Sequence, residues 1–206
     1  GYIIYRGEYL EILEIGENYL SIFWQNVNYT AIAFIINFIF LFCVIYINNT
    51  RIKNALKPFF DTEKKQMPKL PNKSISLILS VIVSAITTEV IINQYMLFTN
   101  STWFGRNDPV FGLDIGFFMF QKPFIETLFT YAIFLIIGLT IYTIIYYIAV
   151  FNICFDGIDR ETLKKSKLLK QLFTNIKILA ILVAGFVLVK TLDIGFDKFL
   201  NLQEDT

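Results

Sequence analysis

Glu89 is the one acidic residue that lies well inside a long apolar stretch of the sequence. If this stretch crosses a membrane, a charge near its middle costs about 2.5–3.5 kcal/mol, which the surrounding Ile, Leu and Val side chains offset at about 0.3–0.6 kcal/mol each. The carboxylate must then face protein or water rather than lipid. It is either a proton- or cation-binding group on a transport path or, as we favour, a structural ion pair with Lys190, which lies at a similar depth in another apolar stretch.

Ser80 and Ser84 belong to a stripe of hydroxyl side chains in the same stretch. Residues three and four apart share one face of a helix, so Ser76 and Thr87 or Thr88 fall in line with them. A polar substrate path would use such a stripe, but small and hydroxyl side chains also let two membrane helices approach closely. We favour helix packing. The matching small residues in the last apolar stretch are Ala180 and Ala184.

Asp108 and Asp114, with Asn107, are the residues best suited to hold a Ca²⁺ ion. Their spacing fits no EF-hand loop, and Ca²⁺ takes six to eight oxygen ligands, so we favour Asx-turn and helix-capping roles. The sequence has no histidine and two cysteines, which excludes a Ser-His-Asp triad, a Cys-His pair and a histidine zinc site within the chain. We expect no catalytic residue, no metal and no cofactor here, and no enzyme activity.

Four apolar stretches must position these residues. They cover residues 29–47, 75–96, 124–151 and 172–192, in a chain that is 55% hydrophobic. Each reaches the roughly 20 residues that a helix needs to cross the hydrocarbon core of a bilayer. Buried helices of soluble proteins rarely run so long without a polar face. The sequence therefore predicts an all-α integral membrane bundle with about four transmembrane helices, occupying residues 27–206.

The lysines and arginines predict the orientation of the bundle, because positively charged loops stay in the cytoplasm. Most of them lie in the loops after the first and third stretches, which places both chain ends and the loop 97–123 outside the cell. These cytoplasmic residues are Arg51, Lys53, Lys57, Lys64, Lys65, Lys69 and Lys73, then Arg160, Lys164, Lys165, Lys167 and Lys170.

Residues 1–26 read as an extracytoplasmic amphipathic segment. Between Glu8 and Trp24, leucine and aromatic residues recur at helical spacing, with glutamates mostly on the other side. The acidic face gives no attraction to anionic lipid, so we expect this helix to pack on neighbouring protein. Because the chain begins with Gly1, we expect it to be a piece of a longer protein.

The loop 97–123 alternates turn-forming residues with aromatic ones. Asp108 and Pro109 favour a tight turn, and Gly112 and Gly116 permit backbone angles that other residues resist. The phenylalanines should cover the outer mouth of the bundle, and Pro123 suits the first turn of the third helix. We treat the following as motif residues: Asp108, Pro109, Phe111, Gly112, Asp114, Phe117, Phe120 and Pro123.

This run resembles the signature of a group of large bacterial multi-pass membrane proteins, the uncharacterised protein family 0182. The resemblance extends to the Phe23-Trp24 pair before the first stretch, whereas Phe118 replaces the more usual Tyr. It implies spans at the N-terminal end of the protein, followed by a large extracytoplasmic domain, in the bacterial plasma membrane. The family has no established activity. The matching residues are Asp108, Pro109, Val110, Phe111, Gly112, Asp114, Ile115, Phe117, Phe120, Pro123 and Phe124.

We therefore expect a multi-pass membrane protein that anchors and organises a larger extracytoplasmic part of its own chain. The alternative is a transporter or channel component in which Glu89, Ser80 and Ser84 line a polar path. The expected partners are the lipid bilayer, the rest of the same chain, and second copies or other membrane proteins. A net charge of +1 gives no reason to expect nucleic acid.

Overall fold

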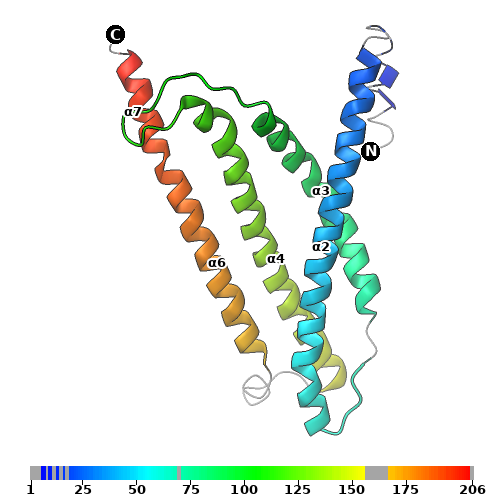
Figure 1. Ribbon diagram of the computed structural model, residues 1–206. Coiled ribbons are helices and arrows are strands. Elements are labelled where there is room, and N and C mark those ends of the chain that lie inside the picture. Colours follow the sequence, from blue (N-terminus) through cyan, green and yellow to red (C-terminus); the bar gives the residue numbers. More distant parts are fainter. Residues whose placement is uncertain are drawn as a thin grey trace.

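The computed structural model shows a chain made of long helices (Figure 1). It describes residues 19–68, 71–155 and 167–204, with a few separate positions before residue 19. In the described residues the only pairing of β type is one isolated bridge, from Asn107 to Asp114, so the predicted all-α class is confirmed. The helices are α2 (Leu20–Thr62), α3 (Asn72–Thr99), α4 (Lys122–Cys154), α6 (Leu168–Thr191) and α7 (Asp193–Glu204), with a π-helical turn, η2 (Phe117–Gln121), before α4.

Four helical stretches are long and apolar enough to cross a membrane, and each contains one predicted span. All four extend beyond the predicted bounds, because the prediction followed hydropathy whereas helical hydrogen bonding continues through polar flanks. The difference is largest for α2, which runs unbroken from Leu20 through the predicted border at residue 26. Pro123 lies in the first turn of α4, as expected.

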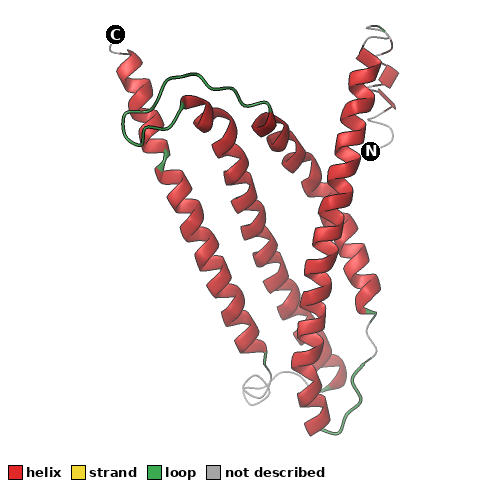
Figure 2. Cartoon of the chain, in the orientation of Figure 1, coloured by secondary structure: helices red, strands yellow, loops and turns green. Residues whose placement is uncertain are grey.

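The helices form two hairpins that lie side by side (Figures 1 and 2). Helix α2 packs mainly on α3 and α6 mainly on α4, while α3 and α4 join the hairpins. Helix α2 begins and α7 ends at the same end of the bundle, which also carries the loop 100–116 and is called here the motif end. The opposite end carries the lysine-rich segments and is called the basic end.

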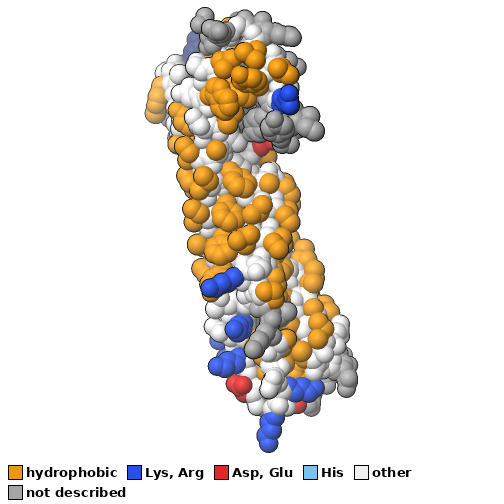
Figure 3. All heavy atoms as spheres, turned by 90° about the vertical axis from the view of Figure 1, so that its right-hand side faces the viewer, with side chains coloured by type: hydrophobic (Ala, Val, Ile, Leu, Met, Phe, Trp, Pro, Cys, Tyr) orange, Lys and Arg blue, Asp and Glu red, His pale blue; other side chains and the backbone are white. Residues whose placement is uncertain are grey.

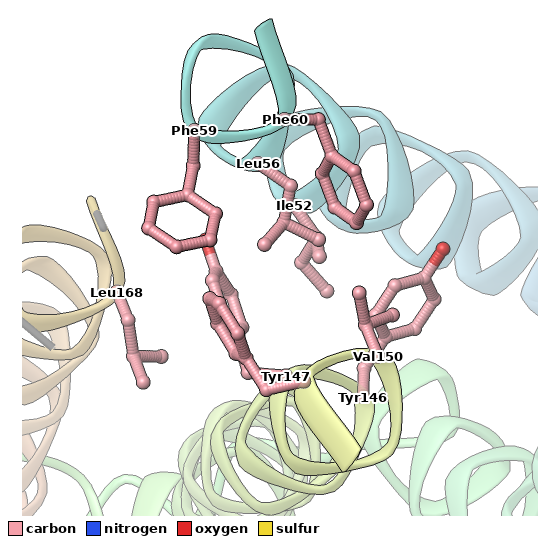
Figure 4. Packing of buried hydrophobic residues seen from close by; sticks show 9 residues of the cluster. Ile52, Leu56, Phe59, Phe60, Tyr146, Tyr147, Val150 and Leu168 are labelled. Atoms are coloured by element: carbon pink, nitrogen blue, oxygen red, sulfur yellow. The ribbon is translucent and has the colours of Figure 1, made fainter. Parts of the chain in front are cut away.

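The hydrophobic core lies at the basic end (Figure 4). The ring of Phe59 meets two others edge to face, with centroid distances of 5.2 Å to Phe151 and 4.9 Å to Phe155. Leu168 adds the start of α6 to the contact between α2 and α4. The buried residues of this core are Ile52, Leu56, Phe59, Phe60, Tyr146, Tyr147, Val150, Phe151 and Leu168.

Away from this core, most apolar side chains lie on the surface. Only 6% of the most apolar part of the last stretch is buried, and Ile86, Phe134 and Ile181 are each about 70% exposed. Figure 3 shows hydrophobic side chains along most of one face, with most of its lysines and arginines gathered at the lower end. Soluble monomers rarely expose apolar patches this large, whereas a bilayer requires them.

The predicted amphipathic segment lies mostly outside the described residues. Its last part, Leu20–Trp24, is the first turn of α2 rather than a separate surface helix. Tyr9 packs against this turn, since its ring centroid lies 5.9 Å from that of Phe23 and 6.2 Å from that of Trp24. All three residues belong to the predicted segment itself, so its packing on neighbouring protein stays a prediction.

Candidate functional site

The loop 100–116 is called here the motif loop. The carboxylate of Asp108 holds its first half together. Its Oδ1 accepts hydrogen bonds from the backbone N–H groups of Val110 at 2.9 Å and Phe111 at 2.7 Å, and its Oδ2 accepts one from Leu113 at 2.7 Å. Its own C=O accepts from the N–H of Gly112 at 3.2 Å. The bond to the residue two positions ahead is the Asx turn that the sequence favoured over Ca²⁺ binding.

Asp114 organises the second half of the loop in the same way. Its Oδ1 accepts from the N–H groups of Gly116 at 2.7 Å and Phe104 at 3.2 Å, and its Oδ2 accepts from Gly105 at 2.8 Å. The contact to Gly116 caps the helical turn that leads into η2. The two carboxylates, only 3% and 5% exposed, therefore close the loop together with the backbone hydrogen bonds around the bridge from Asn107 to Asp114.

The surroundings of both carboxylates favour their ionised form. Burial by itself raises the pKa of Asp108, but the N–H groups of Phe111, Leu113 and Val110 outweigh it and the net effect lowers the pKa. The pKa of Asp114 is likewise lowered by backbone N–H donors in spite of burial. Both groups are thus charged acceptors already satisfied by backbone donors.

Glycine is needed at two positions of the motif for different physical reasons. Gly112 has φ +69°, a left-handed conformation that L side chains resist, as predicted. Gly116, in contrast, has an ordinary helical φ of −56°, so the predicted backbone reason is wrong for this position. A Cβ atom there would collide with the backbone oxygen of Thr102. Gly116 is needed for close approach of two backbone segments.

Helix α7 rests directly on the motif loop. A Cβ atom at Gly195 would collide with Oδ1 of Asp108 and would lie 2.9 Å from Cδ2 of Phe111. One residue later, the ring of Phe196 stacks on that of Phe118, with centroids 5.4 Å apart and an interplanar angle of 21°. The buried Phe118 is therefore an apolar contact surface for α7.

Four charged side chains join the start of α4 to the junction of α6 and α7. Nζ of the buried Lys122 bonds to Oε1 of Glu126 and lies 2.5 Å from Oδ1 of Asp193. Nζ of Lys190 lies 2.9 Å from Oε2 of Glu126 and 3.9 Å from Oδ2 of Asp193. Each cation thus contacts both carboxylates. We call these four residues the charge network.

The charge network corrects the predicted pair of Glu89 with Lys190, because Lys190 pairs with Glu126 instead. Glu89 is exposed on α3, and no ion pair joins it to another described residue. Its depth had suggested Lys190, but that lysine lies on α6, which packs on α4 rather than on α3. The sequence did not reveal Asp193 as a partner, because it follows the last apolar stretch and resembles an ordinary flanking charge.

The serine stripe is buried, as helix packing requires. Ser80 and Ser84 are 0% exposed, and their hydroxyls donate to backbone oxygens of α3 itself. The stripe faces α2, not the predicted Ala180 and Ala184 of α6, because the short connection makes α2 the neighbour of α3. Any polar path along the stripe would require α2 and α3 to separate.

Asparagines of α2 form polar contacts inside the bundle that the sequence did not reveal. The amide nitrogen of Asn37 donates to the hydroxyls of Thr87 and Thr88 at 2.9 and 3.1 Å, and its oxygen accepts from the hydroxyl of Tyr131 at 2.8 Å. Nearer the basic end, Asn48 donates to Thr143 at 3.2 Å. The available signal was Asn37 itself, the one strongly polar residue of the first predicted span. These bonds link α2 to α3 and α4.

The residues that could do chemistry are therefore divided between structural roles. Among the described residues, no three His, Cys, Asp or Glu side chains gather as a metal site. The motif residues and the charge network meet at the first turn of α7, which holds Asp193, Gly195 and Phe196 and is called here the base of α7. Glu89 and the serine stripe lie elsewhere. The arrangement is suited to holding α7 in one orientation.

Comparisons with known proteins show the family to which the chain is related. Residues 14–206 match the model of an uncharacterised protein family, UPF0182. The chain is 28% identical over 148 residues to a UPF0182 protein of Caldicellulosiruptor saccharolyticus and 34% identical over 137 residues to one of Clostridium perfringens. These matches cover 72% and 66% of the chain but only 16% and 15% of those relatives. No solved structure matches the chain.

Proposed function

The chain belongs to the uncharacterised protein family UPF0182, and from this premise we propose that it is a membrane-anchoring module that sets the position of a larger part of the protein outside the cell. The chain spans about a sixth of the length of the relatives, 16% in the first of them. The four apolar helices supply the anchor. The base of α7 supplies the orientation.

In this proposal the basic end lies in the cytoplasm of a bacterial cell and the motif end lies outside. The support is the bias of lysine and arginine toward the basic end. Helix α7, whose residues are much less apolar than those of α6, then stands at the outer membrane surface. It leads the chain away from the bilayer.

One observation carries the proposal, namely that α7 is held from three directions. Asp193 contacts Lys122 at the start of α4, Gly195 lies on Asp108, and Phe196 stacks on Phe118. A helix that only ended a span would not need a glycine at the contact, an aromatic stack and an ion pair within four residues. Such a base transmits a defined direction to whatever follows it.

The proposal is tested with Gly195→Leu in the full-length protein, expressed in cells and treated with protease from outside. The added side chain has no room against Asp108, and overpacking of this kind costs about 1–3 kcal/mol. We expect α7 to undock and external cleavage next to it to become at least about fivefold faster. The protein should remain in the membrane, because the four apolar helices are unchanged.

Gly138→Leu in α4 is the matched control, because a Cβ atom there meets nothing within 4 Å. It adds the same side chain to a helical glycine and should leave cleavage unchanged. Equal cleavage of both variants would show that the base of α7 does not set its orientation. Cleavage that requires inverted vesicles would reject the proposed topology.

A further inference from the structure

An open pocket of about 280 Å³ lies between α2 and α6 at the basic end. It is distinct from the motif end and plays no part in holding α7. Six of its seven lining residues are polar or positively charged and the seventh is Ala55, and the residues from the two helices are more than 100 positions apart in sequence. The residues that matter are Arg51 and Asn54 of α2, and Lys167, Lys170, Gln171 and Thr174 at the start of α6.

We propose that this pocket binds the phosphate-bearing headgroup of an anionic phospholipid in the cytoplasmic leaflet. The inference rests on the topology given under the proposed function. The pocket gathers the cations Arg51, Lys167 and Lys170, and its lining contains no acidic residue. Within the part of the chain that the structure describes, none of the three pairs with a carboxylate. Three cations gathered in this way attract an anion.

The start of α6 adds to the attraction. The first N–H groups of a helix have no partner in the helix and attract anions, an effect that the helix dipole increases. No side chain caps this end of α6, and its first turn has no acidic residue. The buried Gln171 donates from Nε2 to Oδ1 of Asn48 at 3.3 Å, which ties α6 to α2 at the floor of the pocket.

The apolar surfaces beside the pocket indicate a lipid rather than a soluble phosphate. One helical turn from Arg51, Ile47 is 58% exposed, and on the pocket side of α6 Ile178 and Ile181 are 39% and 71% exposed. These side chains continue the two walls of the pocket toward the membrane interior. Acyl chains would lie along them while the phosphate sits among the cations. Basic pockets between helices at the cytoplasmic side are typical headgroup sites.

The test measures binding of dioleoylphosphatidylglycerol to the full-length protein in detergent by native mass spectrometry. The variant Arg51→Gln with Lys170→Gln removes two pocket cations. Each basic side chain near an anionic lipid contributes about a fivefold gain in affinity, so the double variant should bind this lipid about 25-fold more weakly. Dioleoylphosphatidylcholine, which carries no net charge, should bind all forms weakly and equally.

The matched control is Lys53→Gln with Lys57→Gln, which removes two exposed cations of α2 that do not line the pocket. It should change binding less than about threefold. If the double pocket variant is poorly folded, Thr174→Phe fills the pocket while all charges stay, and it should also weaken lipid binding. An equal loss in pocket and control variants, or no loss in a well-folded pocket variant, would overturn the proposal.

Inorganic phosphate distinguishes the two possible sources of the ligand group. At millimolar concentration it should not displace the lipid, and displacement would assign the pocket to a soluble phosphate instead. All variants are also tested for external cleavage next to α7. Equal cleavage of Gly195→Leu and Gly138→Leu would reject the anchoring module, whereas faster cleavage of Gly195→Leu together with unselective lipid binding would reject the headgroup site alone.

Discussion

Replacing Lys122 by Met should destabilise the protein far more than replacing Lys190 by Met, although both lysines contact the same two carboxylates. The side chain of Lys122 is 6% exposed and that of Lys190 is 49% exposed. Removing one partner of a buried ion pair costs about 3–5 kcal/mol, because the other charge is left without compensation. Exposed pairs contribute about 0–1 kcal/mol.

The structure places the expected loss for Lys122→Met at the lower end of that range. Glu126 keeps Lys190 at 2.9 Å, and Asp193 is 41% exposed and retains contact with water. We therefore expect a loss of about 3 kcal/mol for Lys122→Met and at most about 1 kcal/mol for Lys190→Met. The free energies are measured by equilibrium unfolding in mixed micelles, with helix content as the signal.

A double variant separates the burial of charge from the loss of packing. In Lys122→Met with Glu126→Met, no buried carboxylate is left without a partner, and Lys190 still lies 3.9 Å from Asp193. This variant should recover about half of the loss of Lys122→Met. Equal losses for Lys122→Met and Lys190→Met would refute the reasoning, because burial would then not decide the contribution of a charge in this network.

Two further predictions concern the loop and the polar contacts inside the bundle. Asp108 and Asp114 have pKa values below the ordinary value of 3.8, so they stabilise the folded loop above that pH and the stabilisation is lost as the pH falls below it. The fluorescence of the exposed Trp103 should therefore stay constant from neutral pH to about pH 5 and change only below about pH 4; a change centred near pH 6 would contradict this. Asn37→Leu should lower the free energy of unfolding by about 1–2 kcal/mol, because it leaves the hydroxyl of Tyr131 inside the bundle without the acceptor Oδ1 of Asn37. Thr50→Val, which removes a more exposed hydroxyl of α2, should cost less than about 0.5 kcal/mol in the same unfolding assay, and equal losses would show that these contacts add nothing.

The four membrane-length helices were predictable because hydropathy reports which segments avoid water. Their lateral arrangement was not, since hydropathy gives the depth of a residue but not the side of the helix on which it lies. Glu89 and Lys190 share a depth and still do not meet. The serine stripe could nevertheless have predicted the direction in which Glu89 points, because over the five residues from Ser84 to Glu89 a helix turns by a net angle of about 140°. If the stripe faces α2, Glu89 must face away from it.

The motif loop was predictable in part for a similar reason. Local rules identified Asp108 as an Asx-turn residue and Gly112 as a left-handed position, because both effects act within a few residues. The roles of Gly116 and Gly195 depend on Thr102 and Asp108, which approach from elsewhere in the fold. No local pattern reports such an approach.

The charge network has a consequence for the way in which the helices assemble. Lys122 and Glu126 are four residues apart on α4, and Lys190 at the end of α6 is three residues from Asp193 at the start of α7. The start of α4 and the junction of α6 and α7 therefore each carry their own counterion before they meet. When the two segments meet, both neutral couples stay in contact and gain the pairs Lys122–Asp193 and Lys190–Glu126, so neither segment depends on the other to neutralise its charges.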